Sequence, residues 1–305
     1  MESDVALPGI PSAPGEGSGR RVSIQMATPV ELRRNWSGAA GPPDWQTVLG
    51  DGRALDHETG LAGDQRFVYG PDTFLITADA RTVLCAPKHR DDLGWQRQLL
   101  DTILFSVSLA SGFELLHASA VEAGEGVIAF VAPSGGGKSS IAAELVRRGH
   151  RIFCDDVLTI GPSGRELLCH TGPAVMSISR SANLAASLDA TVIGAFADED
   201  ELWVVPQNVA VLPRPLRAVY RLDRSAPSVS VSRIEGPSVV DLLPHAISLP
   251  HDAARARMRF ELFSTLAEGI ELFELEAERT ASTRMLADLV EMSREDVGSL
   301  LAVGR

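Results

Sequence analysis

Lysine is nearly absent from this chain of 305 residues. Of its 28 basic residues only Lys88 and Lys138 are lysines, and all the others are arginines. Lysine carries a compact point charge on a slim stem, which suits a phosphate cradle, whereas arginine presents a broad planar fork. Lys138 directly follows three glycines and is therefore a candidate phosphate-binding residue.

Cysteine, long apolar stretches and positive charge are also scarce, and each shortage excludes a class of protein. The three cysteines, Cys85, Cys154 and Cys169, form no C-x-x-C pair, so we expect buried thiols in a reducing compartment rather than a zinc or disulfide framework. No run approaches the roughly 20 apolar residues of a membrane span, and the absence of a signal pattern predicts a cytoplasmic protein. The net charge of −12 argues against nucleic acid or an anionic membrane as partner.

Composition and periodicity divide the chain into three parts. Residues 1–20 are rich in Pro, Gly and Ser, which predicts a disordered tail. Residues 21–112 combine short strand-like runs with an amphipathic helix from Asp92 to Ser111, so we expect a small β-rich region and a linking helix. Residues 113–305 contain the remaining motifs, and we expect them to form a catalytic domain.

The strongest motif is Ala-Pro-Ser-Gly-Gly-Gly-Lys-Ser at residues 132–139, between an apolar run at 127–131 and a helical pattern at 140–146. Strand, glycine-rich turn, Gly-Lys-Ser and helix together predict a P-loop that binds ATP and Mg²⁺. Backbone N–H groups would surround the phosphates, Lys138 would reach the β- and γ-phosphates, and the Ser139 hydroxyl would hold Mg²⁺. The predicted nucleotide-binding residues are Ser134, Gly135, Gly136, Gly137, Lys138, Ser139 and Ser140.

One feature of this motif departs from the usual pattern. Ala132 stands where the motif usually has glycine, and alanine does not easily adopt a positive φ. The alternative is a glycine-rich turn that precedes Lys-Ser by chance.

Candidate catalytic groups lie on either side of the P-loop. Asp155 and Asp156 follow a short strand-like run at 151–154. One carboxylate would accept the proton of an attacking hydroxyl, and the other would bind Mg²⁺; the alternative is two solvated aspartates in a turn. His117 lies in the strand-like run at 115–121, where it is either part of the site or a hydrogen-bonded core residue.

No comparable placement distinguishes the other histidines considered, which are His150, His170, His245 and His251.

A hairpin pattern at residues 157–169 follows the two aspartates. In doubly wound nucleotide-binding folds a helix normally stands at this point. The pattern therefore predicts an α/β protein with a mixed sheet.

Residues 116–121, the P-loop, Arg148-Gly149-His150 and residues 154–157 together resemble the catalytic core of the HPr serine kinase/phosphorylase family. The resemblance implies a phosphoenolpyruvate carboxykinase-like fold, a mixed sheet with a P-loop. It also implies that Asp155 is the general base, that His117 is its neighbour in the site, and that Ser139 and Asp156 serve Mg²⁺. With Lys138 of the P-loop, Asp155 and His117 are the predicted catalytic residues. Members of the family form ring-like hexamers, which makes a homo-oligomer an option here.

Beyond Cys169 the chain departs from the family pattern. Residues 171–176 lack the acidic, Arg-Gly-containing signature of the bifunctional members, so neither phosphorolysis nor HPr as substrate is implied. Any of Arg180, Arg217 and Arg221 would serve to stabilise transferring charge, and the sequence does not choose among them.

The predicted function is an ATP- and Mg²⁺-dependent kinase that phosphorylates a serine or similar hydroxyl of a protein or peptide. Two alternatives stay open: an ATP-binding regulatory module without phosphotransfer, and a small-molecule kinase.

Overall fold

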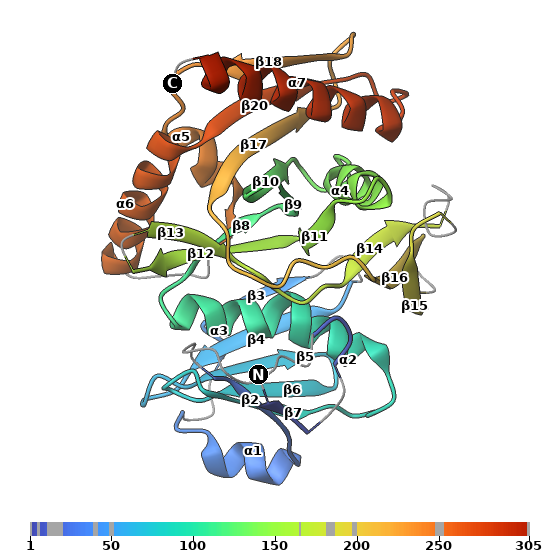
Figure 1. Ribbon diagram of the computed structural model, residues 1–305. Helices are drawn as coiled ribbons and strands as arrows, with labels where there is room; N and C mark the ends of the chain where they lie inside the picture. The colour runs from blue at the N-terminus through green and yellow to red at the C-terminus, as the bar shows by residue number, and fades with distance from the viewer. Residues whose placement is uncertain are drawn as a thin grey trace. The chain divides into compact units, whose positions relative to one another are not determined.

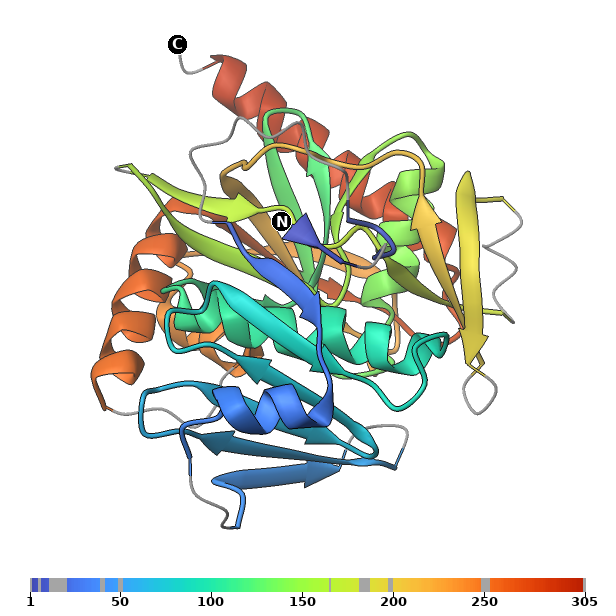
Figure 2. The same ribbon diagram turned by 90° about the horizontal axis from the view of Figure 1, so that it is seen from below.

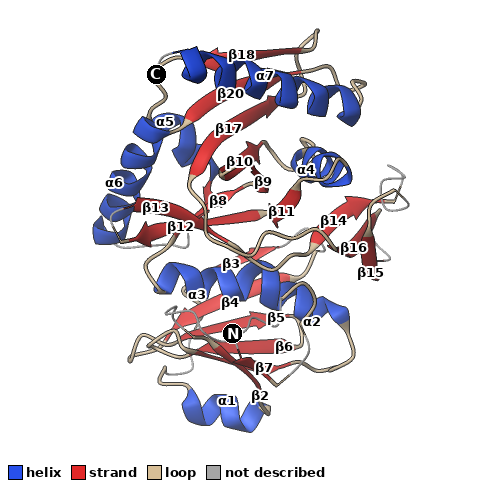
Figure 3. Ribbon diagram, viewed as in Figure 1, coloured by secondary structure: helices blue, strands red, loops and turns tan. Residues whose placement is uncertain are grey.

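The computed structural model describes residues 2–4, 7–10, 21–38, 42–48, 52–164, 166–180, 187–196, 200–247 and 253–303. It divides into two compact units, Met1–Phe113 and Glu114–Arg305. Strands predominate in both units (Figure 3), and the sheets are mixed, which confirms the predicted α/β class. None of the described helices is both long enough and apolar enough to cross a membrane.

The first unit is built on one seven-stranded sheet with the order β1-β2-β7-β6-β5-β4-β3. Its strands are β1 (Glu2–Ser3), β2 (Ser23–Met26), β3 (Trp45–Val48), β4 (Ala54–Thr59), β5 (Gln65–Tyr69), β6 (Asp72–Ile76) and β7 (Thr82–Ala86). Strand β1 lies within the segment predicted as a tail and pairs in parallel with β2. Residues 11–20 of that segment are outside the described residues.

Helices lie on both faces of this sheet (Figures 1 and 2). Helix α1 (Pro29–Asn35) packs through Leu32 against Leu75 and Leu84. On the other face, α2 (Leu93–Gln98) and α3 (Leu104–Ala110) are joined by one π-helical segment, Leu99–Ile103. The predicted helix from Asp92 to Ser111 is thus present with an interruption, and the Asp92 side chain caps it by accepting a hydrogen bond from the Gly94 N–H.

The second unit contains a six-stranded mixed sheet with the order β11-β9-β10-β17-β20-β18. Its strands are β9 (Ser119–Ala123), β10 (Gly126–Val131), β11 (Arg151–Cys154), β17 (Leu216–Asp223), β18 (Ser230–Ile234) and β20 (Glu271–Glu276). Strands β10, β17 and β20 are parallel. Because β9 is antiparallel to both β10 and β11, β10 and β11 run in the same direction and end at the same edge.

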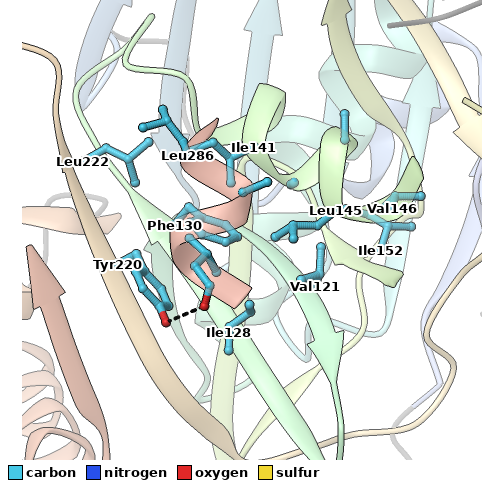
Figure 4. Packing of buried hydrophobic residues seen from close by; sticks show 14 of the residues in the cluster. Val121, Ile128, Phe130, Ile141, Leu145, Val146, Ile152, Tyr220, Leu222 and Leu286 are labelled. Atoms are coloured by element: carbon cyan, nitrogen blue, oxygen red, sulfur yellow. Dashed lines mark hydrogen bonds between the residues drawn. The ribbon is translucent and has the colours of Figure 1, made fainter. Parts of the chain in front are cut away.

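Both faces of this sheet are covered, which explains why β10 is apolar throughout. Its residues Ile128 and Phe130 face α4 (Lys138–Arg147) and α7 (Thr283–Val303), as Figure 4 shows. Val127, Ala129 and Val131 alternate with them and belong to the core beneath α5 (Val239–Leu242) and α6 (Ala253–Gly269). The end of β10 is therefore a rigid support for the loop that follows it.

Two smaller sheets complete this unit. One has the order β13-β12-β8-β19 and the other β14-β16-β15. Their strands are β8 (Glu114–His117), β12 (Val157–Ser163), β13 (Glu166–His170), β19 (Ala246–Ile247), β14 (Met176–Ser179), β15 (Ala190–Phe196) and β16 (Glu201–Pro206).

Two segments cross from one sheet to the other at the same place. The run at 115–121, predicted as one strand, is two strands in different sheets, β8 and β9, with the change at Ala118. Strands β11 and β12 likewise belong to different sheets and are separated by Asp155 and Asp156. The Ala118 N–H donates a hydrogen bond of 3.1 Å to the Asp156 carbonyl, so the two crossings lie side by side.

Helix α6 allows a matched test of the core. Phe263 is fully buried, whereas Phe260, one turn earlier in the same helix, is 51% exposed. We expect Phe263→Ala to lower the free energy of unfolding by about 3–5 kcal/mol, because it leaves a cavity in the core. Phe260→Ala should cost less than about 1 kcal/mol. Urea titrations of both variants measure the difference, and equal losses would contradict this packing.

Candidate active site

The loop between β10 and α4 depends on three consecutive glycines. Gly135 and Gly137 have φ values of +73° and +98°, a region that strains any residue with a side chain. Gly136 has no space for a Cβ atom, which would lie 2.6 Å from the Ala132 Cβ and 2.9 Å from the Pro133 carbonyl oxygen. The predicted strand, glycine loop and helix are all present.

Ala132 fits this loop without strain. Among the described residues, Ala80 and Asp156 are the non-glycine residues with positive φ, so Ala132 adopts an ordinary conformation. Its side chain is buried. The usual glycine is not required at this position, and the departure from the motif has no conformational cost.

Lys138 is buried at the start of α4, with 5% of its surface exposed. Its ammonium group donates a hydrogen bond of 3.3 Å to the Ala132 carbonyl. Burial lowers the pKa of Lys138, while the nearby carboxylates of Asp156 and Asp155 oppose this shift. The lysine charge is therefore held between the loop and the two acids.

Asp155 is joined to the P-loop through serine hydroxyls. Its Oδ1 accepts a hydrogen bond of 2.5 Å from the Ser119 hydroxyl, and its Oδ2 accepts one of 3.1 Å from the Ser177 N–H. The Ser119 oxygen lies 3.4 Å from the Ser139 oxygen. Burial, and secondarily the charge of Asp156, raises the pKa of Asp155 to about 7.

Ser119 was not among the predicted site residues. A fully buried hydroxyl in an apolar strand requires a partner, and here that partner is the carboxylate of Asp155, one of the predicted site residues.

Asp156 and His117 lie next to each other, and both are close to Lys138. Asp156 has a φ of +65°, a strained conformation that aspartate tolerates better than most residues. His117 hydrogen-bonds the Asp156 backbone; burial and the Lys138 charge lower the pKa of His117, and the Asp156 charge opposes them. None of the described residues donates a hydrogen bond to the Asp156 carboxylate. That carboxylate is therefore available to a substrate.

A cavity of about 990 Å³ opens over the P-loop. Its lining includes residues of the loop, of α4 and of β17, and among the predicted residues Ser134, Gly135, Gly136, Gly137 and Ser140. Of the three arginines left open, Arg221 lines this cavity and Arg217 lines a separate pocket. Arg221 forms ion pairs with Glu274 and, at 3.5 Å, with Asp241.

His245 also lines this cavity, although its sequence context did not distinguish it. The charges of Arg221, His117 and Lys138 all act on it. The structure therefore brings together the P-loop, Lys138, Ser139, both aspartates, His117, Arg221 and His245.

The donor atoms at this site suit Mg²⁺. Within the described part of the chain, no group of three or more His, Cys, Asp or Glu side chains is arranged to hold a metal ion. Mg²⁺ needs no such cage, because it commonly binds one or two protein oxygens together with substrate phosphates and water. The Ser139 hydroxyl and the neighbouring Asp155 carboxylate are hard oxygen donors of this kind.

Comparison with known proteins agrees with the sequence resemblance. No family model matches the chain. The curated HPr kinase/phosphorylase of Chlorobium phaeobacteroides (strain BS1) is 40% identical over 73 residues, which are 24% of this chain and 21% of that protein's length. This match confirms that the chain resembles HPr kinase/phosphorylase.

A solved structure, the HPr(Ser) kinase/phosphatase from Coxiella burnetii, matches with a TM-score of 0.33 and 13% identity over 62% of this chain and 96% of that one.

The raised pKa of Asp155 predicts a pH-dependent stability. The Asp155 carboxyl binds its proton more tightly in the folded chain than in the unfolded chain. Its contribution to the free energy of unfolding therefore falls as the pH rises from about 4 to about 7, by at most about 1.4 kcal/mol per pH unit. Asp155→Asn removes the effect. The free energy of unfolding of this variant, relative to the wild type, should therefore increase between about pH 5 and about pH 8. Urea titrations in the presence of EDTA measure it, and a difference that is constant or falls would contradict the raised pKa.

Proposed function

We propose that this chain is a kinase that uses ATP and Mg²⁺ to transfer the γ-phosphoryl group to a serine or similar hydroxyl of a protein or peptide. One observation carries the proposal: the P-loop lysine, two aspartates with different surroundings and His117 lie together, and the P-loop glycines next to Lys138 line a cavity of about 990 Å³. The sequence match to an HPr kinase/phosphorylase supports it.

The surroundings of the two aspartates suggest how they divide the work. Both oxygens of Asp155 already accept hydrogen bonds, and the carboxylate adjoins the Ser139 hydroxyl through Ser119. Asp155 and Ser139 would therefore hold Mg²⁺, directly or through water. Asp156 lies beside His117 and Lys138 with its carboxylate available, which suits a general base. This division is the reverse of the one that the family resemblance implies.

The transfer itself needs few covalent steps from the protein. The Asp156 carboxylate accepts the proton of the acceptor hydroxyl, whose oxygen forms a bond to the γ-phosphorus. The bond from that phosphorus to the β–γ bridging oxygen breaks, and ADP leaves. Lys138, Arg221 and the backbone N–H groups of the loop stabilise the charge on the phosphoryl oxygens. Bound Mg²⁺ supplies further neutralisation of the phosphate charge.

His117 would act as a positioning residue. Its hydrogen bond to the Asp156 backbone holds the strained turn in which the base lies.

The two lysines of the chain provide a matched test of the P-loop. Lys138→Met should reduce transfer of label from γ-³²P-ATP by at least about 10²-fold, because it removes a charge that stabilises the transition state. Lys88→Met, at an exposed position in the other unit, should have no effect. The acceptors to test are arrays of Ser-, Thr- and Tyr-containing peptides and the products of neighbouring genes. Nucleotide binding by the wild type without any transfer would favour a regulatory module instead.

The adjacent aspartates provide the second test. Asp156→Asn should lower the transfer rate by about 10²–10⁴-fold with little change in affinity for Mg·ATP, because it removes the proton acceptor. Asp155→Asn should chiefly raise the Mg²⁺ concentration needed for half-maximal activity. Rates measured across a Mg²⁺ titration separate the two effects. The opposite pattern would restore the roles implied by the family resemblance.

A further inference from the structure

The pairing of β19 with β8 brings a second histidine to the site. The two strands are antiparallel, with Ala246 opposite Leu116 and Ile247 opposite Leu115. His245 directly precedes β19, at the end of the short 3-10 helix Leu243–His245. The charge of His117, the last residue of β8, acts on His245, so this pairing brings the two histidines close to one another.

The surroundings of His245 favour an anion. It lines the same cavity as the glycines of the P-loop and Arg221. Lys138, Arg221 and His117 all act electrostatically on it, and burial together with these positive charges lowers its pKa. Glu274 and Asp241 are already paired with Arg221. A phosphate group entering at this point would offset the mutual repulsion of these cationic groups.

The His245 ring is available to a ligand. It is the last residue of a short 3-10 helix, Leu243–His245, that leads directly into β19. The ring is partly buried, and no described residue forms a hydrogen bond with it. A histidine held in place by its backbone, whose ring has no hydrogen-bond partner among the described residues, is well suited to bind substrate.

We propose that the His245 ring donates a hydrogen bond to a γ-phosphoryl oxygen of ATP and thereby lets the site distinguish ATP from ADP. This inference rests on the proposed function, since it adds a binding residue to the same site. The contact forms and breaks no covalent bond. It assigns to β19 and the turn before it the task of recognising the group that is transferred.

Nucleotide affinities test this contact without an acceptor. Calorimetry of the full chain with Mg²⁺ gives the affinities for ADP and for the non-hydrolysable ATP analogue AMP-PNP. His245→Ala should lower the preference for AMP-PNP over ADP by about tenfold, the value of a charge-assisted hydrogen bond, and leave the ADP affinity unchanged. His245→Gln retains an N–H donor and should recover part of the preference.

His170→Ala is the matched control, because His170 is also a partly buried histidine of this unit but lies outside the cavity. It should keep the wild-type preference, and thermal unfolding of each variant verifies that it is folded. An unchanged preference in His245→Ala, or an equal loss of affinity for both nucleotides, overturns the role of His245 while the proposed function stands. Failure of the wild type to bind either nucleotide overturns the proposed function and this inference with it.

Discussion

The site depends on one backbone hydrogen bond, from the Ala118 N–H to the Asp156 carbonyl. It joins the two places where the chain leaves one sheet and enters another. On one side of this bond lie His117 and Ser119, and on the other lie Asp155 and Asp156. Because a strand that changes sheets must turn, its side chains there no longer alternate between two buried faces. Polar groups can then point toward the end of β10, where the P-loop begins.

The same geometry gives two adjacent carboxylates different environments. Asp155 is held by Ser119 and Ser177, and burial raises its pKa to about 7. Asp156 adopts a positive φ that turns it toward Lys138 and His117. Groups of one chemical type acquire separate roles when their surroundings differ in charge and hydrogen bonding. The strained conformation of Asp156 is held in place by β11 and β12, which belong to different sheets on the two sides of the turn.

Local patterns predicted the parts of the structure that local forces dictate. The strand, glycine loop and helix at 126–147 form where the sequence indicates, and so does the helix after Asp92. The split of residues 115–121 between two sheets was missed, because an apolar run has the same appearance whether one sheet or two bury it. Ser119 and His245 were missed for a related reason: each has an ordinary local context, and its partners lie more than fifteen residues away in the chain.

By itself, the sequence determined a strand, glycine loop and helix, a mixed α/β class and two aspartates following a strand. Glycine conformations, apolar periodicity and strand ends are properties of short segments. Only the tertiary structure decided which carboxylate is held by hydrogen bonds and which is available, and which arginine and which second histidine reach the cavity. Those outcomes depend on strand register and on crossings between sheets, which pair residues distant in the chain. The glycine loop positions Lys138, whereas the pairing of strands in two sheets positions the Asp155, Asp156 and His117 side chains around it.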